Sequence, residues 1–274
     1  MKKIVFLGSG SMAEAIISGI IKAGIIQNEY IFVTNKQDEA RLAFIEATYG
    51  VTTSYDQQAL LKDADVVFLA MKPKDVHEAL IEVREYWSEK QLILSVIAGV
   101  LTETIEDVLG KKLPVIRSMP NTSAKIGFSA TALAMGKYVE AAHEQIAEAL
   151  FQTIGTTKKV EEADMHTVTA VSGSGPAFIY YFVEAMTKAA VEAGMDQATA
   201  DELITQTVIG AGRMLKESGD SPATLRKNIT SQGGTTEAGL QTLAEHNFTN
   251  IIADCIDSAR KRSMDMGEAY RIGK

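Results

Sequence analysis

The sequence predicts an α/β protein: a doubly wound, mostly parallel sheet in its N-terminal part, followed by an all-helical C-terminal domain. Two observations support this fold class. Up to about residue 160, short apolar runs alternate with amphipathic stretches of helical spacing, which is typical of strand–helix–strand units. Beyond that point the runs of strand length stop and long helical patterns remain. We therefore expect two domains, residues 1–160 and residues 161–274.

Five runs in the first part have the character of buried strands. They read KKIVFLG, YIFVTN, ADVVFLAM, QLILSVIAG and LPVIRSMP, and begin at residues 2, 30, 64, 91 and 113. Their cores are continuously apolar, as in strands covered on both faces. The stretches MAEAIISGIIKAG, from Met12, and KDVHEALIEVREYW, from Lys74, have helical spacing and lie between them. This alternation predicts the parallel sheet.

Three long helices are expected in the second part, over residues 175–194, 196–218 and 250–267. Ser174, which precedes Pro176, and Asp196 are the residue types that cap helix N-termini. The segment from Phe178 to Met186 is apolar on more than one face. Such a helix is usually buried by other helices, either of the same chain or of a partner subunit.

Composition narrows the class of protein. The chain has 274 residues, of which 46% are hydrophobic and 23% charged, as in soluble globular proteins. Its net charge of -8 argues against a nucleic-acid partner, because phosphate backbones bind basic surfaces. Cys255 is the single cysteine, so an internal disulfide is impossible. The run LILSVIAGVL is shorter than the roughly 18 apolar residues of a membrane span. We expect a cytoplasmic protein with no membrane partner.

A glycine fingerprint follows the first predicted strand. In VFLGSGSMAEAI, Gly8, Gly10 and Ala13 have the spacing G-x-G-x-x-A and open the first helix. Gly8 permits a tight turn, Gly10 lets the backbone approach a pyrophosphate, and Ala13 lets the helix pack closely. The alternative is a glycine-rich turn without a ligand. This context favours a Rossmann-like dinucleotide site, which includes Gly8, Ser9, Gly10, Ser11 and Met12.

The end of the second predicted strand indicates which dinucleotide binds. An NAD site usually places an acidic residue there for the ribose 2′-hydroxyl. This chain has Asn35 and Lys36 instead, and its first acid is Asp38. Because Asn and Lys can bind a 2′-phosphate that a carboxylate would repel, we expect NADPH as the cofactor, with NADH possible. Lys36 could equally be a solvated loop residue.

Two further loops follow predicted strands, at the edge of the sheet where such folds bind ligands. They are AMKPKD, residues 70–75, and SMPNTSAKIG, residues 118–127. Pro73 is suited to start a helix, which leaves Lys72 at its mouth. Either loop could be a simple connector. From the first loop we expect Ala70, Met71, Lys72 and Pro73 in the cofactor site.

The stretch SQGGTTEAGL in the helical part predicts a site for a small carboxylate. Gly233 and Gly234 can turn successive N–H groups inward to form an anion nest. We expect Thr235 or Thr236 to cap a helix that begins at Glu237. The alternative is a plain helix–helix corner. A second segment with hydroxyls and glycines, VSGSGPAF at residues 171–178, is expected to form a similar turn at a helix start.

The sequence has few candidate residues for a metal site or for acid–base catalysis. The four histidines, at positions 77, 143, 166 and 246, have no metal-ligand spacing, so we expect no metal site. A hydroxy-acid dehydrogenase generally needs a His or Lys base for the alcohol proton, and the helical part has no obvious one, with Lys188 left open. Reduction of an imine requires less acid–base chemistry, because the imine can arrive protonated.

The segment PATLRKNITSQGGTTEAGLQTLAE closely resembles the signature of the pyrroline-5-carboxylate reductase family. The segments GSGSMAEA, MKPKD, SVIAG, RSMPNT and SGSGPAF occur in the same order as in that family, so the resemblance extends from Ile4 to about Ala259. It departs at Gln232, often proline in the family, and at Phe178, commonly tyrosine. The resemblance implies an oxidoreductase of proline biosynthesis that reduces 1-pyrroline-5-carboxylate with NADPH or NADH.

The resemblance also implies roles for individual residues and a homodimer, or a ring of dimers, formed through the helical domain. The substrate carboxylate would be held by Ser231, Gly233, Gly234 and Thr235, and its ring nitrogen by Thr236. The nicotinamide end of the cofactor would lie against Ala70, Lys72, Ala98 and Asn121, and the adenosine phosphate against Asn35 and Lys36. Two other readings stay open: a reductase of a related cyclic imine or 3-hydroxy acid, and a nucleotide-binding regulatory paralogue.

Overall fold

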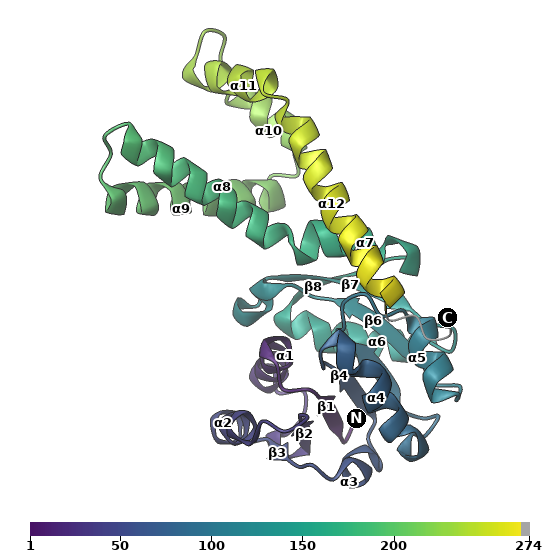
Figure 1. The fold of residues 1–274 in the computed structure, drawn as a ribbon. Helices are drawn as coiled ribbons and strands as arrows, with labels where there is room; N and C mark the ends of the chain where they lie inside the picture. The colour runs from purple at the N-terminus through teal and green to yellow at the C-terminus, as the bar shows by residue number, and fades with distance from the viewer. Residues whose placement is uncertain (270–274) are drawn as a thin grey trace. The chain divides into compact units, whose positions relative to one another are not determined.

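The computed structural model describes residues 1–269 (Figure 1). Contacts divide the chain into two compact units. The first unit contains Met1–Pro176 and the chain from Asp257 onward, and the second contains Ala177–Ile256. This division groups residues by their contacts and does not define where a domain begins or ends. The boundary after residue 160 therefore stays a prediction.

The first unit is built on one sheet. Within the described residues the sheet has eight strands in the order β3-β2-β1-β4-β5-β6-β7-β8, with β7 antiparallel to β6 and every other pair parallel. The strands are β1 (Ile4–Leu7), β2 (Ile31–Thr34), β3 (Thr52–Thr53), β4 (Val66–Leu69), β5 (Leu92–Ser95), β6 (Val115–Met119), β7 (Ser129–Met135) and β8 (Gly155–Lys159). The five predicted strands and the fold class are confirmed. The other three strands, β3, β7 and β8, were not predicted.

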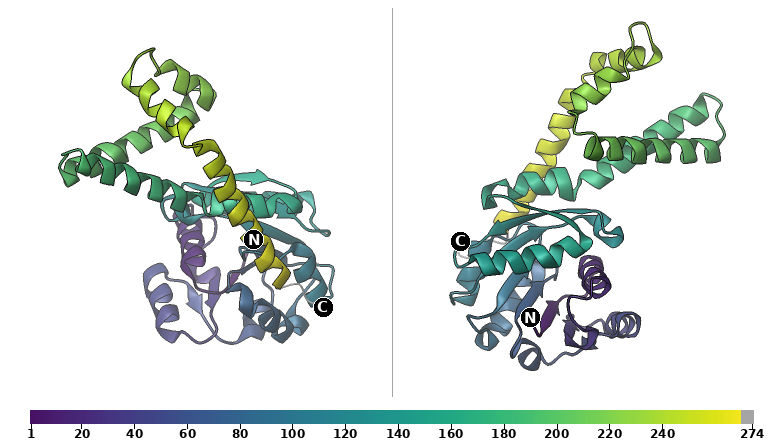
Figure 2. Two further views of the ribbon diagram at one scale, coloured as in Figure 1. Left: turned by 45° about the horizontal axis from the view of Figure 1, so that its top comes forward. Right: turned by 180° about the vertical axis from the view of Figure 1, so that it is seen from behind.

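Helices cover both faces of this sheet (Figure 2), which explains the continuous apolar runs. Ile4 and Phe6 of β1 pack with one set of helices, whereas Val5 and Leu7 pack with the other. The first set is α1 (Ser11–Lys22), α2 (Glu39–Tyr49) and α6 (Ala141–Phe151), and the second is α3 (Gln57–Leu61), α4 (Val76–Glu82) and α5 (Thr102–Leu109). The Phe6 and Phe68 rings stack between paired strands, with centroids 4.4 Å apart.

Short helical turns complete the first unit. The 3-10 turns are η1 (Asn28–Tyr30), η2 (Pro73–Asp75), η3 (Arg84–Tyr86), η4 (Thr122–Ile126), η5 (Gln152–Ile154) and η6 (Glu162–Asp164). Helix α7 (Met165–Val168) continues into a π-helical turn, η7 (Thr169–Gly173). Ser174 follows with helical backbone angles, φ −86° and ψ −23°. The prediction that Ser174 caps a helix is therefore wrong, because an N-cap residue is extended and Ser174 lies inside a nearly continuous helical segment.

Five helices follow: α8 (Gly175–Glu192), α9 (Gln197–Glu217), α10 (Pro222–Asn228), α11 (Thr235–Glu245) and α12 (Phe248–Ala269). The three predicted long helices are confirmed as α8, α9 and α12. Asp196 is the N-cap of α9, since its carboxylate accepts a hydrogen bond from the Thr199 amide at 3.0 Å. In Ala177–Ile256, all of which the structure describes, Ala200 and Ile204 are the buried residues. A single copy of the second unit thus has almost no core of its own.

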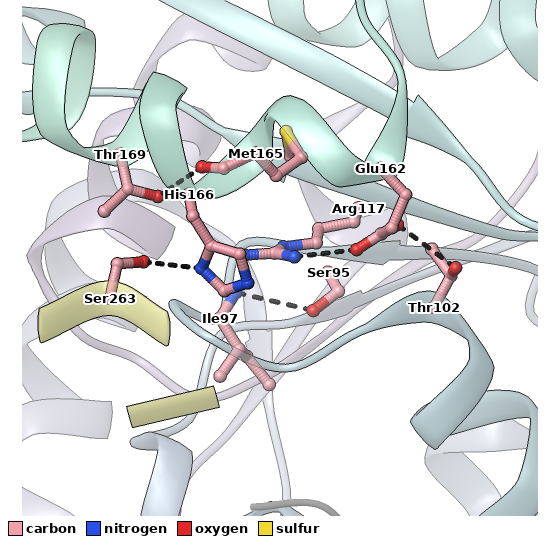
Figure 3. Close-up of polar contacts among 9 residues, drawn as sticks. All are labelled: Ser95, Ile97, Thr102, Arg117, Glu162, Met165, His166, Thr169 and Ser263. Atoms are coloured by element: carbon pink, nitrogen blue, oxygen red, sulfur yellow. Dashed lines mark hydrogen bonds and ion pairs between the residues drawn. The ribbon is translucent and has the colours of Figure 1, made fainter. Parts of the chain in front are cut away.

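A buried arginine interrupts the apolar character of β6 (Figure 3). Arg117 has no exposed surface, and its Nη1 donates to Glu162 Oε1 at 2.7 Å. The Thr102 hydroxyl donates to the other carboxylate oxygen at 3.1 Å, so Arg117 and Thr102 converge on Glu162. Nε and Nη2 of Arg117 have no partner among the residues described. The Glu162 carboxylate is therefore the main group that offsets the free-energy cost of removing the Arg117 charge from water.

This ion pair predicts that replacing Glu162 lowers the free energy of unfolding more than replacing Arg117 does. Glu162→Ala leaves a buried guanidinium without a counter-ion and should lower the free energy of unfolding by about 3 kcal/mol or more. Arg117→Met should cost less, because it replaces the buried charge with an apolar side chain of similar length and leaves Glu162 partly hydrated. Urea unfolding of both variants and of the double variant tests this. A larger loss in Arg117→Met than in Glu162→Ala would contradict it.

Candidate functional site

A cleft of about 1270 Å³ lies in the first unit, at the carboxyl ends of β1, β2 and β4. It exceeds the roughly 300–1,000 Å³ of most small-molecule pockets. Doubly wound sheets bind ligands at this edge. The site lies at the point where later strands are added on the opposite side of the first strand. The position and size of the cleft therefore suit an extended ligand such as a dinucleotide.

Gly8 forms the tightest point of the cleft. Its φ of +117° is rarely adopted by other residues, and a Cβ atom there would lie 2.7 Å from the Met71 amide nitrogen. Its N–H donates to the Thr34 carbonyl at 2.9 Å, and the Ala70 N–H donates to the Leu7 carbonyl at 2.9 Å. Three chain segments thus meet at a point that has no room for a side chain.

Gly10 is different, because no described atom within 4 Å would meet a Cβ atom placed on it. It is the N-cap residue of α1, and it has no side chain to satisfy the first N–H groups of the helix. Ala13 is fully buried where α1 packs on the sheet. The open space beside Gly10 and the free donors of α1 fit the pyrophosphate of a dinucleotide.

Asn35 shapes the turn after β2. Its Nδ2 donates to Ser9 Oγ at 3.0 Å and to the Asp38 carbonyl at 2.8 Å, while its Oδ1 accepts from the Asp38 N–H at 2.7 Å. Its amide therefore already has partners within the protein. Lys36, by contrast, is exposed and extends toward α4.

The Lys36 ammonium contacts two carboxylates. Nζ lies 3.1 Å from Glu78 Oε2 and 3.5 Å from Asp75 Oδ1. The hydrogen bond and charge of Glu78, followed by those of Asp75, raise the pKa of Lys36 above its ordinary value. Lys36 therefore carries a positive charge at the edge of the cleft that follows β2, where it contacts two acids.

Arg41 is a cleft residue that the sequence analysis did not identify. Its Nε donates to the Ser9 carbonyl at 2.8 Å, and its Nη2 pairs with Glu14. Burial raises the pKa of Glu14, but hydrogen bonds from Arg41 and Tyr49 outweigh it and hold that pKa below its usual value. An arginine shortly after β2 is a recognisable signal for a 2′-phosphate site. Arg41 thus joins the fingerprint loop to α2.

The structure gathers most of the predicted cofactor residues in this cleft. Its lining includes Gly8, Ser9, Gly10, Ser11, Asn35, Lys36, Ala70, Met71 and Lys72. The other four lie outside the lining. Met12 packs against the core, Pro73 opens η2, and Ala98 packs against a cluster that contains Met119. Asn121 caps η4 and donates to the Ser172 carbonyl at 3.2 Å. Their contact with a cofactor stays a prediction.

The predicted carboxylate turn lies in the second unit. Gly233 has a φ of +73°, and the Gly234 N–H donates to the Ser231 carbonyl at 3.0 Å. Helix α11 begins at Thr235 with Gly234 as its N-cap, so the prediction that a threonine caps a helix from Glu237 is wrong. The tight turn lets the helix start two residues earlier. Thr235 and Thr236 are consequently in its first turn, where N–H groups lack intrahelical acceptors.

A carboxylate of the chain itself binds this turn. Glu237 Oε2 accepts a hydrogen bond from the Gly233 N–H at 2.7 Å. This contact is a local one at the start of α11, where the helix N-terminus favours negative charge. The second expected turn, VSGSGPAF, is wrong: residues Thr169–Gly173 form the π-helical turn that leads into α8.

Neither a metal centre nor a membrane span is found in the described chain. No group of three or more His, Cys, Asp or Glu side chains could hold a metal ion in residues 1–269. Across the same residues, no helix has both the length and the apolar character to cross a membrane. His143 has a structural partner, since its Nδ1 accepts from the Glu140 N–H at 3.0 Å.

Comparison with known proteins assigns both parts of the chain. Residues 162–266 match the family described as pyrroline-5-carboxylate reductase dimerisation, and residues 3–99 match NADP oxidoreductase coenzyme F420-dependent. Pyrroline-5-carboxylate reductase 2 of Bacillus subtilis (strain 168) is 47% identical over 272 residues, which cover 98% of this chain and 97% of the relative. The chain belongs to the pyrroline-5-carboxylate reductase family.

Solved structures agree with this assignment. The pyrroline-5-carboxylate reductase of Coxiella burnetii has a TM-score of 0.90 at 35% identity. The match covers 97% of this chain and 98% of the Coxiella chain. The Plasmodium falciparum pyrroline carboxylate reductase with NADP bound has a TM-score of 0.85 at 27% identity, over 97% and 98% of the two chains. The predicted family, enzyme class and cofactor type are confirmed.

The two glycines of the fingerprint predict different defects in this reductase. Gly10→Ala should fold normally, because open space receives the methyl group, but should weaken NADPH binding about tenfold or more by obstructing the pyrophosphate. Gly8→Ala should lower the melting temperature, because its Cβ atom has no room. Thermal unfolding and titration of NADPH fluorescence separate the two effects. Unchanged NADPH affinity in a folded Gly10→Ala variant would contradict the assignment of the cleft.

Proposed function

We propose that this protein reduces the cyclic imine 1-pyrroline-5-carboxylate to L-proline, with NADPH as the preferred reductant and NADH as a possible one. The observation that carries the proposal is that a member of this family has a large cleft at the carboxyl ends of β1, β2 and β4 and a glycine turn with an N–H bonded to a carboxylate. The cofactor, when bound, supplies a hydride for the imine carbon. The residues of the chain bind and orient the reactants.

The predicted cofactor residues divide into three groups in this proposal. The α1 N-terminus and the loop from Gly8 to Ser11 bind the pyrophosphate, and Lys36 binds the adenosine phosphate with Asn35 fixing its turn. The open space beside Gly10 and the exposed Lys36 ammonium support this placement. Ala70, Lys72, Ala98 and Asn121 are proposed for the nicotinamide end.

The turn in the second unit is proposed to hold the substrate. Ser231, Gly233, Gly234 and Thr235 would bind its carboxylate, and the Thr236 hydroxyl would orient the ring nitrogen. The hydrogen bond from the Gly233 N–H to the Glu237 carboxylate supports this role, because it places a carboxylate acceptor on an N–H of the turn. An imine that arrives protonated needs no base, so orientation is the main contribution of the protein.

A homodimer formed through the helical region is part of the proposal. Tyr180, Tyr181 and Phe182 are 59%, 74% and 44% exposed on consecutive positions of α8. Exposed apolar surface of this kind typically marks an interface between proteins. The dimerisation family matches residues 162–266, which include α8. Assembly of dimers into a ring, a cytoplasmic location and the domain division at residue 160 are further parts of the proposal.

The hydroxyl of Thr236 provides a test of the mechanism. Thr236→Ala should lower kcat/KM for 1-pyrroline-5-carboxylate by roughly 10²-fold, because it removes one oriented hydrogen-bond partner of the reacting group. NADPH affinity should not change. Thr236→Ser keeps the hydroxyl and is the matched control. The assay follows loss of nicotinamide absorbance, and wild-type turnover in Thr236→Ala would remove this residue from the mechanism.

The proposed interface predicts a change in assembly. Tyr181→Glu places a charge on the apolar face of α8 and should convert the dimer to a monomer, as measured by light scattering during size-exclusion chromatography. Tyr181→Phe keeps the apolar ring at the same position and is the matched control, so it should remain a dimer. A dimer that survives Tyr181→Glu, or dissociates equally in Tyr181→Phe, would argue against this face.

A further inference from the structure

The cations at the adenosine end of the cleft already contact acids of the chain. Arg41 pairs with Glu14, while Lys36 contacts Glu78 and Asp75. Both amide hydrogens of Asn35 are also donated within the protein. A 2′-phosphate at this end therefore competes with resident partners.

Lys36 is the cation best able to change partner. Its side chain is 63% exposed, compared with 26% for Arg41, which is also fixed by the Ser9 carbonyl. Lys36 lies just after β2, whereas its two acidic partners lie on η2 and α4, which follow β4 (Figure 1). The ion pairs thus join the two loops on either side of the cleft. A phosphate bound after β2 would draw the ammonium away from α4.

We propose that Glu78 is a specificity-determining residue that weakens the preference for NADPH over NADH by holding Lys36 away from the 2′-phosphate. The inference rests on the proposed role of Lys36. NADH lacks the 2′-phosphate, so it does not require Lys36 to leave Glu78. NADPH does require this exchange, and its phosphate also meets the remaining negative charge of Glu78.

The cleft contains several acids besides Glu78. The lining contains the acids Glu14, Asp38, Glu39, Asp75, Glu78 and Glu82 and the cations Lys36, Arg41, Lys72 and Lys74. Glu78 has the shortest contact to Lys36 and its side chain is 74% exposed, so its replacement should not disturb the fold. Asp75 is 27% exposed and precedes α4, so its replacement could also alter the helix start.

Binding of nucleotide fragments tests the proposal without turnover. The probes are adenosine 2′,5′-bisphosphate, which carries the 2′-phosphate, and 5′-ADP, which lacks it. Isothermal titration of Glu78→Gln should show two- to fivefold tighter binding of the bisphosphate and unchanged binding of 5′-ADP. The gain should shrink in high salt, because these charges are exposed and screened. Equal tightening for both probes, or none, would overturn the proposal.

Two further variants separate partner exchange from simple repulsion. Glu82→Gln removes the same charge from the same helix one turn further along, where Glu82 contacts Gln57 instead of Lys36. Its effect should be clearly smaller. In a Lys36→Met background, Glu78→Gln should give less than half of its gain in affinity for the bisphosphate. An equal gain with and without Lys36 would overturn the exchange.

These titrations contain no imine, so their outcome is independent of whether the protein reduces 1-pyrroline-5-carboxylate. A failed reductase assay with a positive titration would overturn the proposed function and leave the role of Glu78. A positive reductase assay with a negative titration would support the reductase activity and remove Glu78 as a determinant of cofactor preference. The ratio of NADPH to NADH turnover should rise in Glu78→Gln if both proposals hold.

Discussion

The close approach of Gly8 to the backbone of Ala70 and Met71 is the constraint on which the cleft depends. It brings the ends of β1 and β4 together and starts α1 at the position where its free N–H groups face a ligand. The fully buried Ala13 and the stacked rings of Phe6 and Phe68 hold the same segments by packing in the interior. Binding geometry at the edge of the sheet is therefore a consequence of packing in its interior.

The N-terminal strands could be predicted because burial on both faces gives a continuous apolar run, which is a local signal. Strand β7 has no such signal: its SATALAM sequence is rich in small residues and it runs antiparallel to β6. Strand β8, with the sequence GTTKK, is largely polar. Such strands form because neighbours supply hydrogen bonds, and the sequence of one segment does not contain that information.

The site shows the same division. A glycine fingerprint is local, so the turn at Gly8 and Gly10 could be predicted, as could the tight turn at Gly233. The partners of Lys36 are about forty positions away along the chain, and no local pattern identifies them. The capping role of Ser174 and the start of α11 were mispredicted because a serine or threonine beside Pro or Gly is compatible with several backbone geometries. Tertiary packing decides among these geometries.

The near absence of buried side chains between Ala177 and Ile256 has a consequence for how this protein reaches its native state. Ordering five helices costs conformational entropy that Ala200 and Ile204 alone cannot offset. In the proposed homodimer the second copy supplies the missing free energy, so folding of this unit is a bimolecular event. Its stability then depends on protein concentration, and dilution acts on it as a denaturant would.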